Sequence, residues 1–99
     1  MAMQARISTI EGDASKIDAA VEIINEKVLP TLKDLDGFTA ANFMVDRSAG
    51  KLVVVAFYRD EAALEGSAAA VEPLRTDVSE AMDGKIVGLE SYELVAQSW

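Results

Sequence analysis

The stretch FTAANFMVDRSAGKLVVVAFYR, residues 38–59, decides the fold of this chain. Two segments rich in Val, Phe and Tyr, Phe38–Arg47 and Lys51–Arg59, flank the tripeptide Ser48-Ala49-Gly50. β-Branched and aromatic residues favour strands, and a short loop that ends in glycine supplies the left-handed residue that a hairpin needs. The stretch therefore predicts two antiparallel strands joined by a tight turn.

An amphipathic helix is predicted on each side of this hairpin, because apolar residues recur there at three- and four-residue steps. The first helix follows a cap at Asp13 or Ser15 and stops at Asp36-Gly37, with a break expected at Val28–Thr31 because Pro30 removes a backbone donor. Its apolar residues are Ile17, Ala20, Val21, Ile24, Val28, Leu32 and Leu35.

The second helix is predicted to begin after a cap at Asp60 and to stop at Asp83-Gly84. Its first half is expected to be irregular because it contains Gly66 and Pro73. Its apolar residues are Leu64, Ala68, Val71, Leu74, Val78 and Met82.

Two outer strands complete the pattern. Gln4–Glu11 ends at a Gly-Asp turn, and Lys85–Ala96 alternates loosely between apolar and polar residues. The resulting order βαββαβ predicts a single α+β domain over residues 1–99, a ferredoxin-like sandwich with both helices on one face of an antiparallel sheet.

The hairpin is expected to be apolar on both faces. If Arg47 pairs with Lys51, one face carries Ala40, Asn42, Met44, Val54, Ala56 and Tyr58, and the other carries Ala41, Phe43, Val45, Val53, Val55 and Phe57. Two helices can cover only one face, so a second copy of the chain is expected on the other, giving a homodimeric α/β barrel.

Composition excludes several classes of function. The 17 acidic and 9 basic residues give a net charge of −8, which repels phosphate backbones, so no nucleic-acid partner is expected. With 0 His and 0 Cys, the chain has no imidazole base, thiolate nucleophile, or His or Cys metal ligand. No apolar run is long enough to span a bilayer and no leader is recognised, so we expect no membrane association and a cytoplasmic location.

Four residues are candidates for lining a ligand pocket: Asn42, Tyr58, Ser67 and Val71. An amide on an otherwise apolar face needs a partner, so Asn42 is either a hydrogen-bonded structural residue or a ligand contact. The phenol of Tyr58 either points into a pocket or completes the core. Trp99, the last residue, either packs against a partner subunit or lines the pocket.

Residues 29–67 resemble the antibiotic-biosynthesis-monooxygenase-like family. The resemblance rests on Leu29-Pro30, Gly37-Phe38, the Gly50 hairpin and the run from Tyr58 to Ser67. That run is similar to the family signature Trp-x-Asp/Ser-x-x-Ala-Leu-x-x-His, with Tyr58 at the Trp position and Ser67 at the His position.

The resemblance implies a small dimeric α/β barrel whose pocket, between sheet and helices, takes a hydrophobic or aromatic molecule. Some members oxidise phenols or quinols with O₂ and no cofactor, a reaction often linked to an Asn on the first strand, where this chain has Arg6, Ser8 and Thr9. Others degrade haem through an imidazole ligand, and this chain contains no His.

Three hypotheses follow from the sequence. The leading one is a homodimer that binds a small hydrophobic or aromatic ligand, with cofactor-independent monooxygenase activity on a phenol or quinol; no cofactor and no metal are expected. The alternative is a non-catalytic ligand-binding, stress-associated or pathway accessory protein on the same fold. The third, an RNA-recognition module, shares the element order but is disfavoured by the charge of −8.

Overall fold

A computed structural model describes residues 2–98 of the chain, so Trp99 lies outside the described residues. The strands are β1 (Gln4–Glu11), β2 (Phe38–Asp46), β3 (Lys51–Tyr58) and β4 (Lys85–Glu93). The helices are α1 (Ile17–Ile23), α2 (Leu29–Lys33), α3 (Glu61–Gly66) and α4 (Ala68–Ala81), with a 3₁₀ turn at Ala14–Lys16 and a π-helical segment at Ile24–Val28. The βαββαβ order is confirmed, and the last strand ends three residues before the predicted Ala96.

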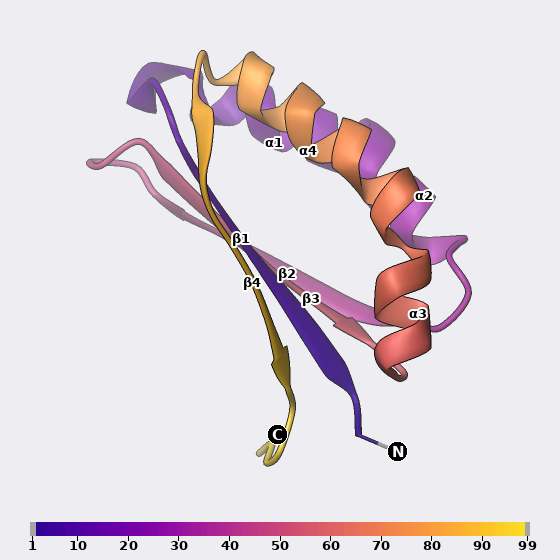
Figure 1. Cartoon of the computed structure of the whole chain (residues 1–99). Coiled ribbons are helices and arrows are strands. Elements are labelled where there is room, and N and C mark those ends of the chain that lie inside the picture. The colour runs from indigo at the N-terminus through magenta and orange to yellow at the C-terminus, as the bar shows by residue number, and fades with distance from the viewer. Residues whose placement is uncertain (1, 99) are drawn as a thin grey trace.

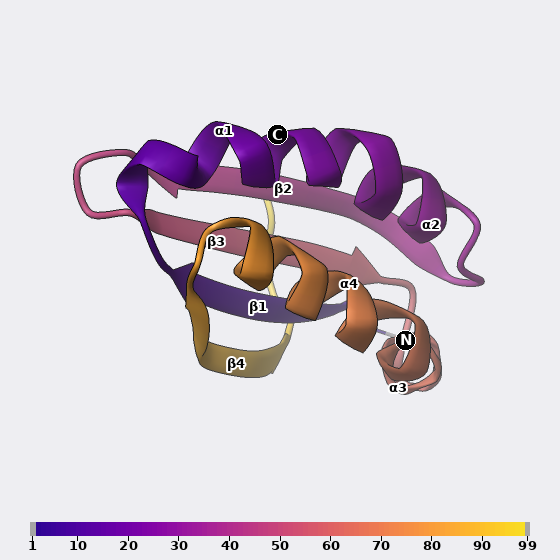
Figure 2. The same ribbon diagram turned by 90° about the horizontal axis from the view of Figure 1, so that it is seen from above.

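The four strands form one antiparallel sheet in the order β2-β3-β1-β4. All helices lie on one side of this sheet, as Figure 1 shows from the side and Figure 2 from above. This is the predicted ferredoxin-like α+β sandwich. We call the side that meets the helices the inner face and the opposite side the outer face.

Both predicted helix caps are present. The Asp13 side chain accepts a hydrogen bond from the backbone N–H of Ser15, and the Asp60 side chain accepts one from the backbone N–H of Ala63 at 2.8 Å. Each cap satisfies a backbone donor that the first turn of a helix leaves without a partner.

Pro30 disturbs its helix earlier than predicted. The expected break was Val28–Thr31, but the chain stays helical through Pro30 and the irregular part is the π-helical segment Ile24–Val28. A proline ring clashes with the carbonyl four residues earlier, and the wider π turn moves that carbonyl away from the ring. In the second helix, the break falls at Ser67, between α3 and α4, while Pro73 is accommodated inside α4.

The predicted hairpin register is wrong by one residue. Asp46, not Arg47, pairs with Lys51, so Phe43 lies opposite Val54 and Asn42 lies opposite Val55. The loop is therefore one residue longer than assumed, and Asp46 accepts hydrogen bonds from the backbone N–H groups of Ser48 and Ala49 within it. As a result, Asn42 lies on the outer face, opposite to the face that carries Tyr58.

The main core fills the space between the inner face and the helices. Its buried residues are Ile10, Ile17, Ala20, Ile24, Val28, Leu32, Leu52, Leu74, Val78 and Met82. The outer face has no helix over it (Figure 1), and Met44 and Tyr92 on that face are 50% and 52% exposed. Within residues 2–98, no helix is long and apolar enough to cross a membrane.

Candidate functional site

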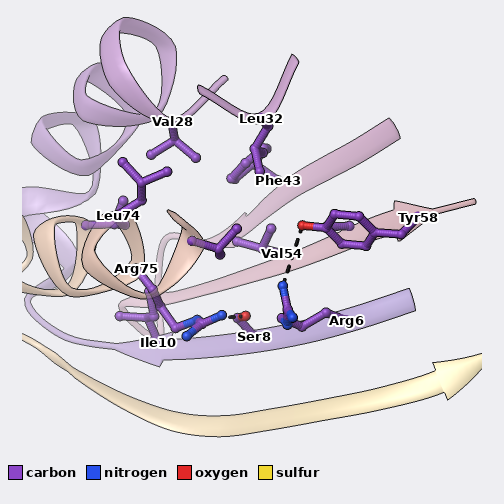
Figure 3. A pocket seen from close by; sticks show the side chains of 13 residues that line it. Arg6, Ser8, Ile10, Val28, Leu32, Phe43, Val54, Tyr58, Leu74 and Arg75 are labelled. Carbon is purple, nitrogen blue, oxygen red and sulfur yellow. Dashed lines mark hydrogen bonds between the residues drawn. The ribbon is translucent and has the colours of Figure 1, made fainter. Parts of the chain in front are cut away.

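A cavity lies between the inner face of the sheet and the helices. Its volume is about 40 Å³. The cavity is lined by Arg6, Ser8, Ile10, Val28, Leu32, Phe43, Val54, Ala56, Tyr58, Val71, Leu74, Arg75 and Val78. Figure 3 shows apolar side chains on one side and a polar group formed by Arg6, Ser8, Tyr58 and Arg75 on the other.

Three elements bring the polar group together. Arg6 and Ser8 are two residues apart on β1, so both side chains reach the inner face. Tyr58 is the last residue of β3, and Arg75 approaches from α4. A mostly apolar cavity with a few convergent polar groups is the usual composition of a small-molecule site.

Arg6 and Tyr58 contact each other in two ways. Arg6 Nη1 donates to the Tyr58 hydroxyl at 3.5 Å, and the guanidinium carbon lies 5.5 Å from the centre of the Tyr58 ring. Phe38 meets the same ring edge-on, with the ring centroids 5.9 Å apart. Because Tyr58 is fully buried, this packing fixes the direction in which its hydroxyl points.

The Arg6 guanidinium also donates hydrogen bonds to acceptors at the end of α3. Arg6 Nη1 donates to Ser67 Oγ at 2.9 Å, and Arg6 Nη2 donates to the Leu64 carbonyl at 2.9 Å. Ser67 Oγ itself donates to the same carbonyl at 2.6 Å. The Leu64 carbonyl, which the backbone N–H of Ser67 also approaches to 3.3 Å, thus accepts hydrogen bonds from both Ser67 and the buried arginine at the end of α3.

The Arg75 guanidinium makes fewer hydrogen bonds than the Arg6 guanidinium among the described residues. Its Nε donates to Ser8 Oγ at 3.2 Å. Burial lowers the pKa of Arg75, and the positive charge of Arg6 lowers it further. The site therefore concentrates two positive charges next to an apolar cavity.

The structure brings together only some of the residues singled out in the sequence. Tyr58 and Val71 line the cavity. Ser67 lies behind Arg6 and borders a separate surface groove, and Asn42 is exposed on the outer face. The predicted grouping of Asn42 with Tyr58 on one face is wrong because of the register difference described above.

Sequence reasoning missed Arg6 and Arg75 as pocket residues. The signal for Arg6 was its spacing, because it alternates with Ser8 and Ile10 on a strand whose inner face is otherwise buried. For Arg75 the signal was its position next to Leu74 on the buried side of α4. Residues 2–98 contain no group of three or more His, Cys, Asp or Glu side chains placed to hold a metal ion.

Comparison with known sequences finds relatives but no defined family. No family model matches the chain. The uncharacterised protein Rv2557 of Mycobacterium tuberculosis is 28% identical over 92 residues, which cover 93% of this chain and 41% of that protein. The chain thus spans about two-fifths of the length of this curated relative.

Comparison with solved structures identifies the fold. A candidate antibiotic biosynthesis monooxygenase from Caulobacter crescentus superimposes with a TM-score of 0.75 at 14% identity, over 96% of this chain and 92% of that chain. The ActVA-Orf6 monooxygenase of Streptomyces coelicolor, in complex with nanaomycin D, gives 0.68 at 17%, over 99% and 89%. SnoaB, a cofactor-independent oxygenase from Streptomyces nogalater, gives 0.64 at 12%, over 100% and 97%. The chain has the fold of these proteins, as the resemblance in the sequence implied.

Proposed function

We propose that this chain binds a small hydrophobic or aromatic molecule in the cavity between its sheet and its helices. The observation that carries the proposal is the composition of the cavity wall, in which apolar side chains face a polar group formed by Arg6, Ser8, Tyr58 and Arg75. Apolar walls bind the body of a ligand, and a few fixed polar groups orient it. A monooxygenase of similar fold forms a complex with nanaomycin D, which supports small-molecule binding by a chain of this fold.

The size of the cavity restricts the ligand. An engineered apolar cavity of about 150 Å³ is known to hold benzene, whereas this one offers about 40 Å³. A single ring therefore requires side chains or helices at the cavity to move outward. The π-helical segment Ile24–Val28 departs from regular α-helical hydrogen bonding in this layer, and its last residue, Val28, lines the cavity.

We further propose that the site catalyses cofactor-independent oxygenation of a phenol or quinol. In such a reaction the substrate supplies the electrons. Anthrone, for example, takes up one O₂, its CH₂ group becomes a carbonyl, and one water is released. Deprotonation of the substrate places negative charge on its oxygen, and the guanidinium groups of Arg6 and Arg75 would stabilise that charge in a partly desolvated site.

The alternative is a non-catalytic binding protein on the same fold. It is favoured by the absence of a His or a carboxylate among the residues that line the cavity, which leaves proton removal without a strong base. Fold does not separate the two functions, because function depends on the site.

Measurement of oxygen uptake distinguishes the catalytic function from the non-catalytic binding function. The full chain is incubated with single-ring quinols and with anthrone, and dissolved O₂ is recorded together with the absorbance of the product. Catalysis predicts uptake above the rate without protein, and Tyr58→Phe and Arg6→Gln slow it. Binding of the same compounds without any uptake supports the accessory function, and no binding of any of them contradicts the proposal.

We also propose that a second copy of the chain covers the outer face. The centre of that face is made by Ile7, Val53, Val55 and Phe57, which lie on the two middle strands. The charged residues Asp46, Lys51, Glu11 and Lys85 form one row across its hairpin end, with alternating sign. An apolar patch with balanced charge at its border suits a self-complementary contact between two chains of net charge −8.

A further inference from the structure

The two arginines at the cavity differ from the other arginines of the chain in lacking a carboxylate partner. Arg47 pairs with Asp18 at 2.9 Å, and Arg59 pairs with Asp36 at 3.5 Å and Asp60 at 3.4 Å. Neither Arg6 nor Arg75 has a carboxylate oxygen within 4.0 Å among residues 2–98. In a chain with 17 acidic residues, the two guanidinium groups at the cavity thus lack an ion-pair partner in the described part of the chain.

Every acceptor that these two side chains use is neutral. Arg6 donates to the Tyr58 hydroxyl, Ser67 Oγ and the Leu64 carbonyl. Arg75 donates from Nε to Ser8 Oγ, and its Nη1 and Nη2 groups have no acceptor in the described part of the chain. The terminal N–H groups of Arg75 are thus charged donors that remain available to a ligand at this wall.

Burying this charge is unfavourable for the chain alone. Arg6 is 8% exposed, and Arg75 is half-buried beside it. The negative charge of Glu72 raises the pKa of Arg75, but burial and the charge of Arg6, which lower it, have the larger effect. Glu72 lies one turn before Arg75 without forming an ion pair, and Glu61, Glu65 and Glu93 border a groove on the far side of Arg6. A buried charge without a counterion costs free energy, and such local conflicts are expected where a ligand completes the structure.

We propose that the ligand of this cavity is an organic anion, an apolar or aromatic body that carries a carboxylate, and that Arg75 binds the carboxylate. A carboxylate accepts two parallel hydrogen bonds from the terminal nitrogens of a guanidinium, which are the groups that Arg75 leaves unused. Its charge also offsets the repulsion between Arg75 and Arg6. The apolar body then lies against Val71, Leu74 and Phe43.

This inference rests on the proposed ligand-binding function and narrows its ligand class. Benzoate, benzamide and phenol are suitable probes, because all three carry one ring and only benzoate is an anion at pH 7. Binding to the full chain is measured by calorimetric titration at fixed ionic strength. We expect benzoate to bind about tenfold or more tightly than benzamide, as a charge-assisted pair of hydrogen bonds implies.

Variants assign this preference to Arg75. In Arg75→Gln the preference for benzoate should fall to within about twofold, whereas Arg75→Lys, which keeps the charge, should retain part of it. Arg47→Gln removes an ion-paired surface arginine outside the cavity and should leave the preference unchanged. Circular dichroism and the unfolding temperature establish that each variant is folded.

The outcomes separate the inference from the function on which it rests. If benzamide and phenol bind as tightly as benzoate, the anion assignment is overturned and the ligand-binding function stands. A preference for benzoate that persists in Arg75→Gln overturns the role of Arg75. If none of the three probes binds, the proposed function fails together with the inference.

Discussion

Tyr58 is the residue at which the packing of the core and the chemistry of the cavity meet. Its ring is fully buried against Phe38, and its hydroxyl accepts a hydrogen bond from Arg6. A phenolic hydroxyl that accepts one hydrogen bond still has its own proton to donate. The Tyr58 proton has no acceptor among the described residues, so it is free to bind an oxygen atom of a ligand.

Tyr58→Phe is therefore expected to keep the fold and to weaken binding of phenol. One lost hydrogen bond is worth about 0.5–1.5 kcal/mol, which corresponds to roughly a two- to tenfold increase in Kd. Calorimetric titration of wild type and variant with phenol measures the difference. Tyr92→Phe is the matched control, since Tyr92 is exposed on the outer face. Equal phenol affinity in wild type and Tyr58→Phe would remove Tyr58 from contact with the ligand.

For single residues, the sequence predicts whether a side chain is buried better than it predicts on which face of the sheet the side chain lies. The apolar period of each helix identifies Leu74 and Val78 as core residues, and both are buried. The face on which Asn42 lies depends on the hairpin register, and that register depends on one residue of loop length. The burial of Arg6 is not predicted by the sequence, because arginine side chains are usually exposed. In this fold Arg6 is buried because Ser67 Oγ and the Leu64 carbonyl, at the end of α3, accept hydrogen bonds from its guanidinium.

Helix α3 depends on its cap, because it is only 6 residues long. A hydrogen bond from the backbone N–H of Ala63, followed by the interaction with Arg59, holds the pKa of Asp60 below its ordinary value of 3.8. A carboxyl whose pKa is lower in the folded state stabilises the fold above its unfolded pKa and loses that effect as the pH falls through its folded pKa.

Asp60→Ala should accordingly lower the unfolding temperature at pH 7. The difference between wild type and variant should shrink as the pH falls below about 4, because Asp60 then takes up a proton in the unfolded wild-type chain at a higher pH than in the folded chain. Thermal unfolding followed by circular dichroism at pH 7, 5 and 3 measures it. Glu65→Ala, which removes an exposed carboxylate of the same helix, serves as the control. A difference that stays constant from pH 7 to pH 3 would contradict an ionised cap.

Two glycines near the site should respond in opposite directions to replacement by alanine. An added Cβ at Gly66 meets nothing within 4 Å, and the residue has no left-handed backbone conformation. Gly66→Ala should stabilise the chain by about 0.5–1 kcal/mol, because alanine favours helix and restricts the unfolded chain. Urea unfolding measures the change, and a destabilised Gly66→Ala would mean that the break between α3 and α4 needs the flexibility of glycine.

Gly37→Ala is the matched contrast. Gly37 has a φ of +80°, and an added Cβ would lie 2.4 Å from the Cβ of Ala63. The left-handed conformation alone costs a residue with a side chain about 1–2 kcal/mol, and the clash adds to it. The same urea titration should therefore show lower stability for Gly37→Ala. Stability equal to that of wild type would show that the loop before β2 can rearrange.

The sequence predicts those features of the helices and strands that depend on neighbouring residues, such as strand bounds and helix caps. β1 has the predicted bounds, β2 and β3 each end one residue early, and both Asp caps form. The position of the irregular turn near Pro30 was not predictable in the same way. A helix can meet a proline by ending or by widening the turn before it, and the choice depends on how Ile24 and Val28 pack into the core.

The whole molecule leaves one face of its sheet uncovered. Helices α1, α2, α3 and α4 all lie on the inner side (Figure 2), so the apolar residues at the centre of the outer face are only half-buried in a single chain. An exposed apolar sheet face of this kind favours association. The sequence predicted two apolar faces, and the corrected register keeps both apolar while exchanging Asn42 and Phe43 between them.

The proposed homodimer has a direct test in solution mass. Light scattering at micromolar concentration should return twice the 10.6 kDa of one chain, and the unfolding temperature should rise with protein concentration.

Val55→Asp places a carboxylate at the centre of the outer face, between Ile7 and Asn42 on the neighbouring strands. A charge buried without a partner costs several kcal/mol, comparable with the stability of a small domain, so this variant should be monomeric or unfolded. Ala49→Asp adds the same charge to the exposed hairpin loop and should leave the dimer intact. A wild-type mass of one chain, or a Val55→Asp dimer that unfolds at the wild-type temperature, would show that the outer face is not the interface.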